Sequence, residues 1–220
     1  MPASQGRDQF AETGRVWLRA ALTEAALAPF DAAAASHSGK PGARLAAHPA
    51  FAPDAPLGRI LAKHWPGVVA RRALVFDKTE VQNWGLPWHQ DRIIAVRERH
   101  DLPGFRNWSQ KQGVWHCEPP VEVLNRMLFV RLHLDPSESD NGAMEIALGS
   151  HHTGVILDTE ARTAAQSFKV EPCLAARGDV LVMHMLTLHR SGPALRASSR
   201  RTLRLDYALT DLPAPLEWAM

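Results

Sequence analysis

The feature that most constrains the fold of this chain is a series of short apolar or alternating runs that begins near residue 68. At least six runs are separated by turn residues, and they cover 68–76, 92–98, 127–135, 143–148, 179–185 and 201–209. Short strands at such spacing are typical of a sandwich or a barrel. In the last run, odd positions 203–209 are apolar or aromatic and even positions 202–206 are polar. This strand therefore has one apolar and one polar face, and a polar inner face suits a ligand cavity.

The first 66 residues carry a different pattern, with two stretches of helical character. An alanine-rich stretch runs from Thr23, a candidate N-cap, to Ala35, and apolar residues in 55–65 recur at helical spacing. Pro29 predicts that the first helix starts late or is kinked. We expect one domain over 1–220 that is mainly β with flanking helices, with a helical part at 1–66 and a strand-rich core at 67–210.

Charge and composition narrow the classes of partner. The formal net charge is +2 at pH 7 and the basic residues are scattered, so we expect neither nucleic acid nor a membrane surface as a partner. No run approaches the roughly 18 apolar residues of a membrane helix, and the first residues lack the apolar stretch of a secretory signal. Two cysteines do not indicate a disulfide framework. We therefore expect a cytoplasmic protein whose ligand is a small molecule.

Two His-X-Asp triplets are candidates for a metal site, one with His89 and Asp91 and one with His133 and Asp135. Within a strand, residues two apart point to the same side, so either pair could converge on one ion. Asp135 precedes Pro136 and a stretch rich in Ser, Asp and Asn, where aspartate is commonly a turn residue. We therefore favour His89 and Asp91 as ligands, and His133 remains a candidate for the wall of the cavity.

A third ligand is expected from a histidine on a neighbouring strand, and His189 is the best placed because it follows an apolar run. Two histidines and one carboxylate leave three metal positions open, which is the arrangement of non-haem Fe(II) oxygenases. A cupin-like or zinc enzyme that uses a metal-bound water would also need three protein ligands. A non-catalytic jelly roll that binds a small molecule beside a degenerate metal site is the third alternative.

Four ordered motifs resemble those of the phytanoyl-CoA dioxygenase family of Fe(II)- and 2-oxoglutarate-dependent oxygenases. They are WHQD at 88–91, NGAMEIALGSH at 141–151, GDVLVMH at 178–184 and HRSGPALRASSRR at 189–201. The resemblance implies a double-stranded β-helix, a jelly-roll and cupin-like fold, with N-terminal helices packed on one sheet. It also implies an enzyme that uses Fe(II), O2 and 2-oxoglutarate to hydroxylate a small molecule, with release of succinate and CO2.

The resemblance also implies roles for individual residues. It makes His89, Asp91 and His189 the iron ligands and places Arg200, eleven residues after His189, on the C5 carboxylate of 2-oxoglutarate. The fixed fork of arginine suits a carboxylate, with which it forms two parallel hydrogen bonds. Ser191 resembles the hydroxyl that assists this arginine. Both residues argue against a metal enzyme without 2-oxoglutarate, and a carboxylate ligand favours hydroxylation over halogenation.

Further candidates lie upstream of the metal pair and in a long loop expected at 97–120. Lys78 and Asn83 are candidate second contacts to 2-oxoglutarate, although a solvated lysine and a turn asparagine explain them equally well. The loop is either a lid or an ordinary surface loop. The candidate substrate contacts are Trp108, Trp115, His116 and His151.

Overall fold

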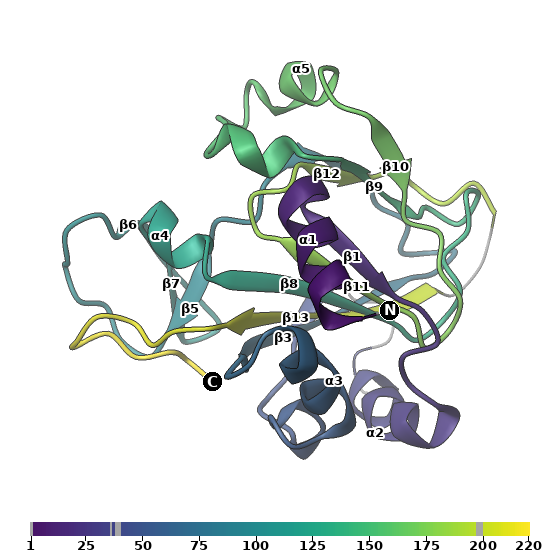
Figure 1. Cartoon of the computed structure of the whole chain (residues 1–220), viewed down its shortest axis with the longest axis horizontal. Coiled ribbons are helices and arrows are strands. Elements are labelled where there is room, and N and C mark those ends of the chain that lie inside the picture. Colours follow the sequence, from purple (N-terminus) through teal and green to yellow (C-terminus); the bar gives the residue numbers. More distant parts are fainter. Residues whose placement is uncertain (1, 36, 38–40, 197–199) are drawn as a thin grey trace.

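The computed structural model describes residues 2–35, 37, 41–196 and 200–220, and its described elements form three antiparallel sheets with flanking helices (Figure 1). The α-helices are α1 (Ala3–Thr13), α2 (Glu24–Ala35), α3 (Pro56–His64), α4 (Val121–Leu124) and α5 (Ala161–Ala165). Single 3-10 turns lie at Pro49–Phe51 and Ser150–Thr153. Within these ranges, each helix is too short or too polar to cross a bilayer.

The largest sheet has six strands in the order β1-β11-β8-β13-β3-β2. Their bounds are β1 (Arg15–Leu18), β11 (Val180–His184), β8 (Met127–His133), β13 (Arg200–Ala208), β3 (Val69–Lys78) and β2 (Pro41–Arg44). The long central strand β13 pairs with β3 on one side, where Arg200 lies opposite Lys78, and with β8 on the other, where Thr202 lies opposite His133. This register gathers the polar faces of three strands on one side of the sheet.

A four-stranded sheet faces this polar side and completes the jelly roll. Its order is β10-β9-β12-β4, with bounds β10 (Val170–Pro172), β9 (Met144–Ala147), β12 (His189–Ser191) and β4 (Leu86–His89). Met144, His189 and Ser191 of this sheet line one cavity together with Phe129 and Arg200 of the large sheet. Among the described residues the two sheets remain separate and do not close into one barrel. The mainly β prediction with a jelly-roll core is confirmed.

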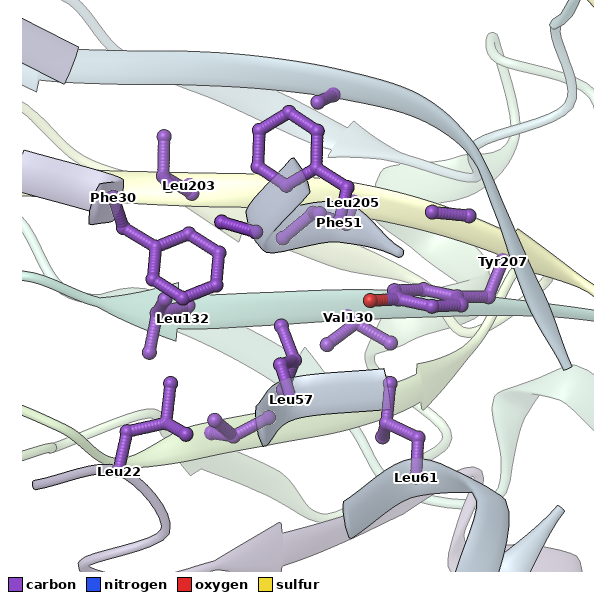
Figure 2. Close-up of a cluster of buried hydrophobic side chains, with 14 of the residues drawn as sticks. Leu22, Phe30, Phe51, Leu57, Leu61, Val130, Leu132, Leu203, Leu205 and Tyr207 are labelled. Atoms are coloured by element: carbon purple, nitrogen blue, oxygen red, sulfur yellow. The ribbon is translucent and has the colours of Figure 1, made fainter. Parts of the chain in front are cut away.

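Two helices cover the opposite, apolar face of the large sheet (Figure 2). Phe30 of α2 and Leu57 of α3 pack in one cluster with Leu205 and Tyr207 of β13, and all four side chains are buried. Each buried side chain of this size contributes about 1.5–3 kcal/mol to folding. Figure 1 shows both helices on one side of the large sheet and the four-stranded sheet on the other. The predicted odd and even faces of β13 are therefore confirmed.

The N-terminal part is less purely helical than its sequence indicates. Both predicted helices exist, and the amide of Ala26 donates to the Thr23 hydroxyl at 3.4 Å, so Thr23 caps α2. The predicted late start is wrong, since α2 begins at Glu24 and continues through Pro29. The part also contributes β1 and β2, which form the two edges of the large sheet. The parts expected at 1–66 and 67–210 therefore share one sheet.

The loop expected at 97–120 is largely a β-hairpin. Strands β6 (Arg106–Lys111) and β7 (Val114–Glu118) pair with each other, and β7 also pairs with β5 (Ile94–Val96). Gln112 and Gly113 join β6 and β7 with φ angles of 53° and 79°. Two successive positive φ angles match a tight hairpin turn of the primed type. The prediction of a loop was wrong here because β6 is mostly exposed and therefore lacks an apolar alternation.

Candidate active site

The structure brings His89, Asp91 and His189 together between the two main sheets. His89 ends β4 and lies opposite His189, the first residue of β12. One ligand atom from each of the three residues lies within 4.8 Å of the others. Asp91 lies just beyond the end of β4, where its backbone amide donates to the carbonyl of Met185 at 3.1 Å. The convergence therefore comes from cross-strand pairing and this loop contact rather than from a continuous strand.

The hydrogen bonds of the two imidazole rings fit a metal site. Nδ1 of His89 lies 2.7 Å from the carbonyl of Pro87, and Nδ1 of His189 lies 2.9 Å from that of Thr187. A carbonyl only accepts hydrogen bonds, so each Nδ1 carries the proton and each Nε2 presents a lone pair. Nε2 of His189 lies 3.1 Å from Oδ2 of Asp91, a buried oxygen without a hydrogen bond. Two lone pairs that face each other at this distance repel, and a cation bound between them would remove this repulsion.

Electrostatics keep Asp91 and His89 in the forms that a metal needs. Burial opposes ionisation of Asp91, but the guanidinium of Arg204 holds the pKa of this carboxyl well below its usual range. Burial lowers the pKa of His89. At neutral pH the carboxylate is therefore ionised and the His89 ring is neutral, as metal ligation requires.

A buried chain of ion pairs continues from Asp91 into the large sheet. Arg204 donates to Asp91 at 2.5 Å and to Asp206 at 2.8 Å, and Asp206 also accepts from Arg72. The alternation of its strand predicts Arg204 on the polar face, but no motif in the sequence assigns it a role. Because Arg204 follows Arg200 by four residues in one strand, both side chains lie on the same face, and this was the only indication in the sequence that Arg204 is near the site. The pairing with Asp91 depends on contact between residues 113 positions apart, which no local pattern reveals.

The other end of the same cavity carries two buried arginines without a carboxylate partner among the described residues. Arg200 donates from Nη1 to the Ser137 hydroxyl at 3.4 Å, and its Nε has no partner. Arg131 likewise has an unpaired Nε. Burial and their mutual repulsion lower the pKa of Arg200 to about 9, and burial lowers the pKa of Arg131 to about 10. Because buried charges are normally paired, this end of the cavity suits an anion.

Ser191 was predicted to assist Arg200, and Lys78 and Asn83 to contact 2-oxoglutarate; the structure places the first two close to Arg200 but not Asn83. Ser191 lines the cavity. Lys78 is buried opposite Arg200 and donates from Nζ to the carbonyl of Gly192 at 2.5 Å. Asn83 is not brought to the cavity, because its side chain makes two hydrogen bonds to the backbone of Ala194. Asn83 therefore orders the loop beside the cavity.

The buried Lys78 gives a prediction for stability. Burial, followed by the charges of Arg200 and Arg131, lowers the pKa of Lys78 from 10.5 to about 7. Between these values the unfolded chain binds a proton that the folded chain does not, so this group makes the protein without 2-oxoglutarate less stable as pH falls from 10.5 to 7. We expect Lys78→Met to be more stable than the wild type at pH 7. Urea unfolding across this window should show the difference shrinking toward pH 10.5, and a difference independent of pH would contradict the assignment.

Three of the four predicted substrate contacts do not line the cavity of the triad, and the fourth lines a neighbouring cavity. Trp108 and Trp115 of the hairpin pack edge-to-face, 6.4 Å apart, against the core and do not line the cavity of the triad. His151 stacks on His152 at 4.0 Å and bonds to the carbonyl of Ala11 in α1, so it is not brought to the site either. His116 lines a neighbouring cavity that also includes Asp91.

The two residues of the other His-X-Asp triplet, His133 and Asp135, each contact different partners. Asp135 accepts hydrogen bonds from the backbone and side chain of Arg201, at 2.8–2.9 Å. Arg201 also pairs with Asp31, so its guanidinium is held by two carboxylates. His133 is buried beside Ser137, with Nδ1 3.1 Å from the hydroxyl. Arg200 and Arg201 thus lie on opposite faces of the sheet, as their sequence positions predict.

Comparisons with known proteins identify the family and the fold. A family described as phytanoyl-CoA dioxygenase matches residues 11–202. The crystal structure of AviO1 from Streptomyces viridochromogenes Tue57 is similar at 21% identity and a TM-score of 0.63, covering 97% of this chain and 98% of that one. HygX from Streptomyces hygroscopicus, with nickel and 2-oxoglutarate bound, has 16% identity and a TM-score of 0.62, with 94% and 87% covered. These identities show a shared fold. The comparison with curated proteins finds no match.

Two further solved structures come from nogalamycin biosynthesis. The non-haem α-ketoglutarate-dependent carbocyclase SnoK has 14% identity and a TM-score of 0.67, with 96% of this chain and 87% of that one covered. The epimerase SnoN, solved with Fe3+, α-ketoglutarate and nogalamycin RO, has 14% identity and a TM-score of 0.67, with 97% and 91% covered. Proteins of this fold therefore catalyse more than one kind of reaction.

Proposed function

The chain belongs to the phytanoyl-CoA dioxygenase family, and from this premise we propose that it hydroxylates a small molecule at an iron held by His89, Asp91 and His189. As a member of this family it is an Fe(II)- and 2-oxoglutarate-dependent enzyme that uses O2. The observation that carries the proposed ligand set is the cluster of two Nε2 lone pairs and one ionised carboxylate within 4.8 Å. Two histidines and one carboxylate are the ligand set of such oxygenases.

The chain's own residues prepare the site before any ligand arrives. The carbonyls of Pro87 and Thr187 fix the orientation of the two rings, and Arg204 keeps Asp91 ionised. When bound, iron and 2-oxoglutarate supply the oxidising chemistry with O2, and 2-oxoglutarate leaves as succinate and CO2. Apolar side chains at the cavity wall, among them Phe129, keep bulk water from the site.

Arg200 is the proposed partner of the distal carboxylate of 2-oxoglutarate, with Ser191 beside it. Two observations support this role: the guanidinium is buried, and its Nε has no hydrogen-bond partner. Arg131 adds a second uncompensated charge at the same end of the cavity. A metal enzyme that needs only a bound water has no use for two buried, unpaired guanidiniums, so these charges favour a dianionic cosubstrate.

Asp91 supports hydroxylation over halogenation, because a carboxylate fills the metal position that a halide would need. A small-molecule substrate is supported by SnoN, which was solved with nogalamycin RO. The reactions named for SnoK and SnoN are carbon-ring formation and epimerisation. The product of the reaction must therefore be identified together with the substrate.

Succinate release is the direct test of this function. Protein loaded with Fe(II) is expected to convert 2-oxoglutarate to succinate in the presence of O2, slowly alone and faster with its substrate. A metabolite library screened for acceleration, followed by mass analysis for a gain of one oxygen, would identify substrate and reaction together. Zn(II)-loaded protein is the control. Turnover of a substrate by the Zn(II) form without succinate would favour a hydrolytic metal enzyme instead.

A further inference from the structure

A second cavity of about 310 Å³ reaches the triad at Asp91. Its wall comes from β2, β3 and β13 of the large sheet, the segment after β4 and the β6–β7 hairpin. The volume lies at the lower end of the roughly 300–1,000 Å³ typical of small-molecule sites. Arg204 lines both this cavity and the one that contains Arg200. The second cavity therefore borders one proposed ligand of the metal, Asp91, and is separate from the cavity that contains Arg200.

The lining of this cavity is strongly cationic. The positively charged side chains are Arg44, Arg72, Lys111 and Arg204. Two of these charges are balanced, since Arg72 pairs with Asp206 and Arg204 pairs with both Asp206 and Asp91. Among the described residues, neither Arg44 nor Lys111 forms an ion pair with a carboxylate. The cavity thus has positive charge that the protein itself does not neutralise.

Arg44 is held in place by a neutral partner. Its Nη2 lies 2.6 Å from Nε2 of His116, and Nδ1 of the same ring lies 3.0 Å from the carbonyl of Val114. Because Nδ1 donates to that carbonyl, Nε2 must accept from Arg44. Burial and the charge of Arg44 lower the pKa of His116 to about 4, so the ring carries no charge at neutral pH. This contact orients the guanidinium and leaves its charge available.

We infer that this second cavity binds the substrate and that Arg44, with Lys111, holds an anionic oxygen group of it, either a carboxylate or a phosphate. Arginine binds both groups through paired, charge-assisted hydrogen bonds. Because Asp91 lines the cavity, the rest of the substrate would lie beside a proposed ligand of the metal. The inference rests on the proposed function, because the cavity is a substrate site only if Asp91 holds the iron.

Anion binding tests this inference without turnover. The protein would be loaded with Ni(II), which is redox-inert here, and with 2-oxoglutarate, which fills the Arg200 cavity. It would then be titrated calorimetrically with inorganic phosphate and with acetate. We expect at least one anion to bind at millimolar concentration, and Arg44→Ala to weaken it at least about tenfold. Lys111→Ala, on the exposed hairpin, should weaken the same anion by a smaller factor. Arg59→Ala removes one positive charge from the exposed surface of α3 and is the matched control.

The outcomes of this titration distinguish the two kinds of anionic group and can contradict the inference. Phosphate binding without acetate binding identifies a phosphorylated substrate, and the reverse identifies a carboxylic acid. Absence of binding by both anions overturns the inference, as does an equal loss in Arg59→Ala and Arg44→Ala. Lys111→Ala guards against a folding defect in Arg44→Ala. The affinity of the wild type for Ni(II) and 2-oxoglutarate is measured separately, so failure of the proposed function would be seen there.

Discussion

Replacing Asp91 with alanine is expected to abolish iron-dependent turnover of 2-oxoglutarate while the protein stays folded. Asp91 supplies the only carboxylate of the proposed ligand set. We expect the rate to fall by more than about a hundredfold, which exceeds the usual effect of losing a residue that only supports a ligand. The fold should persist because Arg204, the buried partner of Asp91, keeps its second carboxylate, Asp206. Succinate formation and iron content would be measured together with circular dichroism.

Asp135→Ala is the matched control for this variant. Asp135 belongs to the rival His-X-Asp triplet, but in the structure it pairs with Arg201 on the opposite face of the sheet. A partly exposed ion pair of this kind contributes about 0–1 kcal/mol to stability, so the control should fold and retain iron. If Asp135→Ala loses the iron and Asp91→Ala keeps it, the proposed ligand pair is wrong.

The second large effect is expected at Arg200, whose side chain faces the cavity, in contrast to its neighbour Arg201. Losing a buried arginine that makes charge-assisted hydrogen bonds to a carboxylate should cost roughly 3 kcal/mol, about a hundredfold in affinity. Arg200→Ala should therefore raise the 2-oxoglutarate concentration needed for half-maximal succinate formation by that order. Arg201→Ala should change it little, because Arg201 is committed to Asp135 and Asp31.

Titration of both variants with 2-oxoglutarate separates the two arginines. Their unfolding midpoints in urea would be compared first, so that a loss of affinity is not confused with a loss of folded protein. A large shift in Arg201→Ala with none in Arg200→Ala would reverse the assignment of the two faces of β13.

Features that repeat along the chain could be predicted from the sequence. Alternation along β13 gave its apolar and polar faces, and with them the difference between Arg200 and Arg201. The helices near Thr23–Ala35 and 55–65 followed from composition and spacing. These predictions succeeded because each depends on neighbours within one element, where backbone periodicity decides which side chains share a face.

Features that depend on strand pairing could not be predicted in the same way. The contact of Arg204 with Asp91 and that of Arg44 with His116 join residues 113 and 72 positions apart. The hairpin at 106–118 was missed because the exposed residues of β6 do not alternate in polarity. Register between distant strands is set by the packing of the whole sheet, and a single sequence does not reveal it.

The chain of ion pairs from Arg72 through Asp206 and Arg204 to Asp91 has a consequence for how iron enters the protein. The carboxylate is anchored by a network that belongs to the large sheet, so folding itself orders this ligand. In small zinc domains, by contrast, the ligands come together only when the metal binds. We therefore expect this polypeptide to fold before it acquires the metal. We expect protein depleted of iron to stay folded and to take up the metal again.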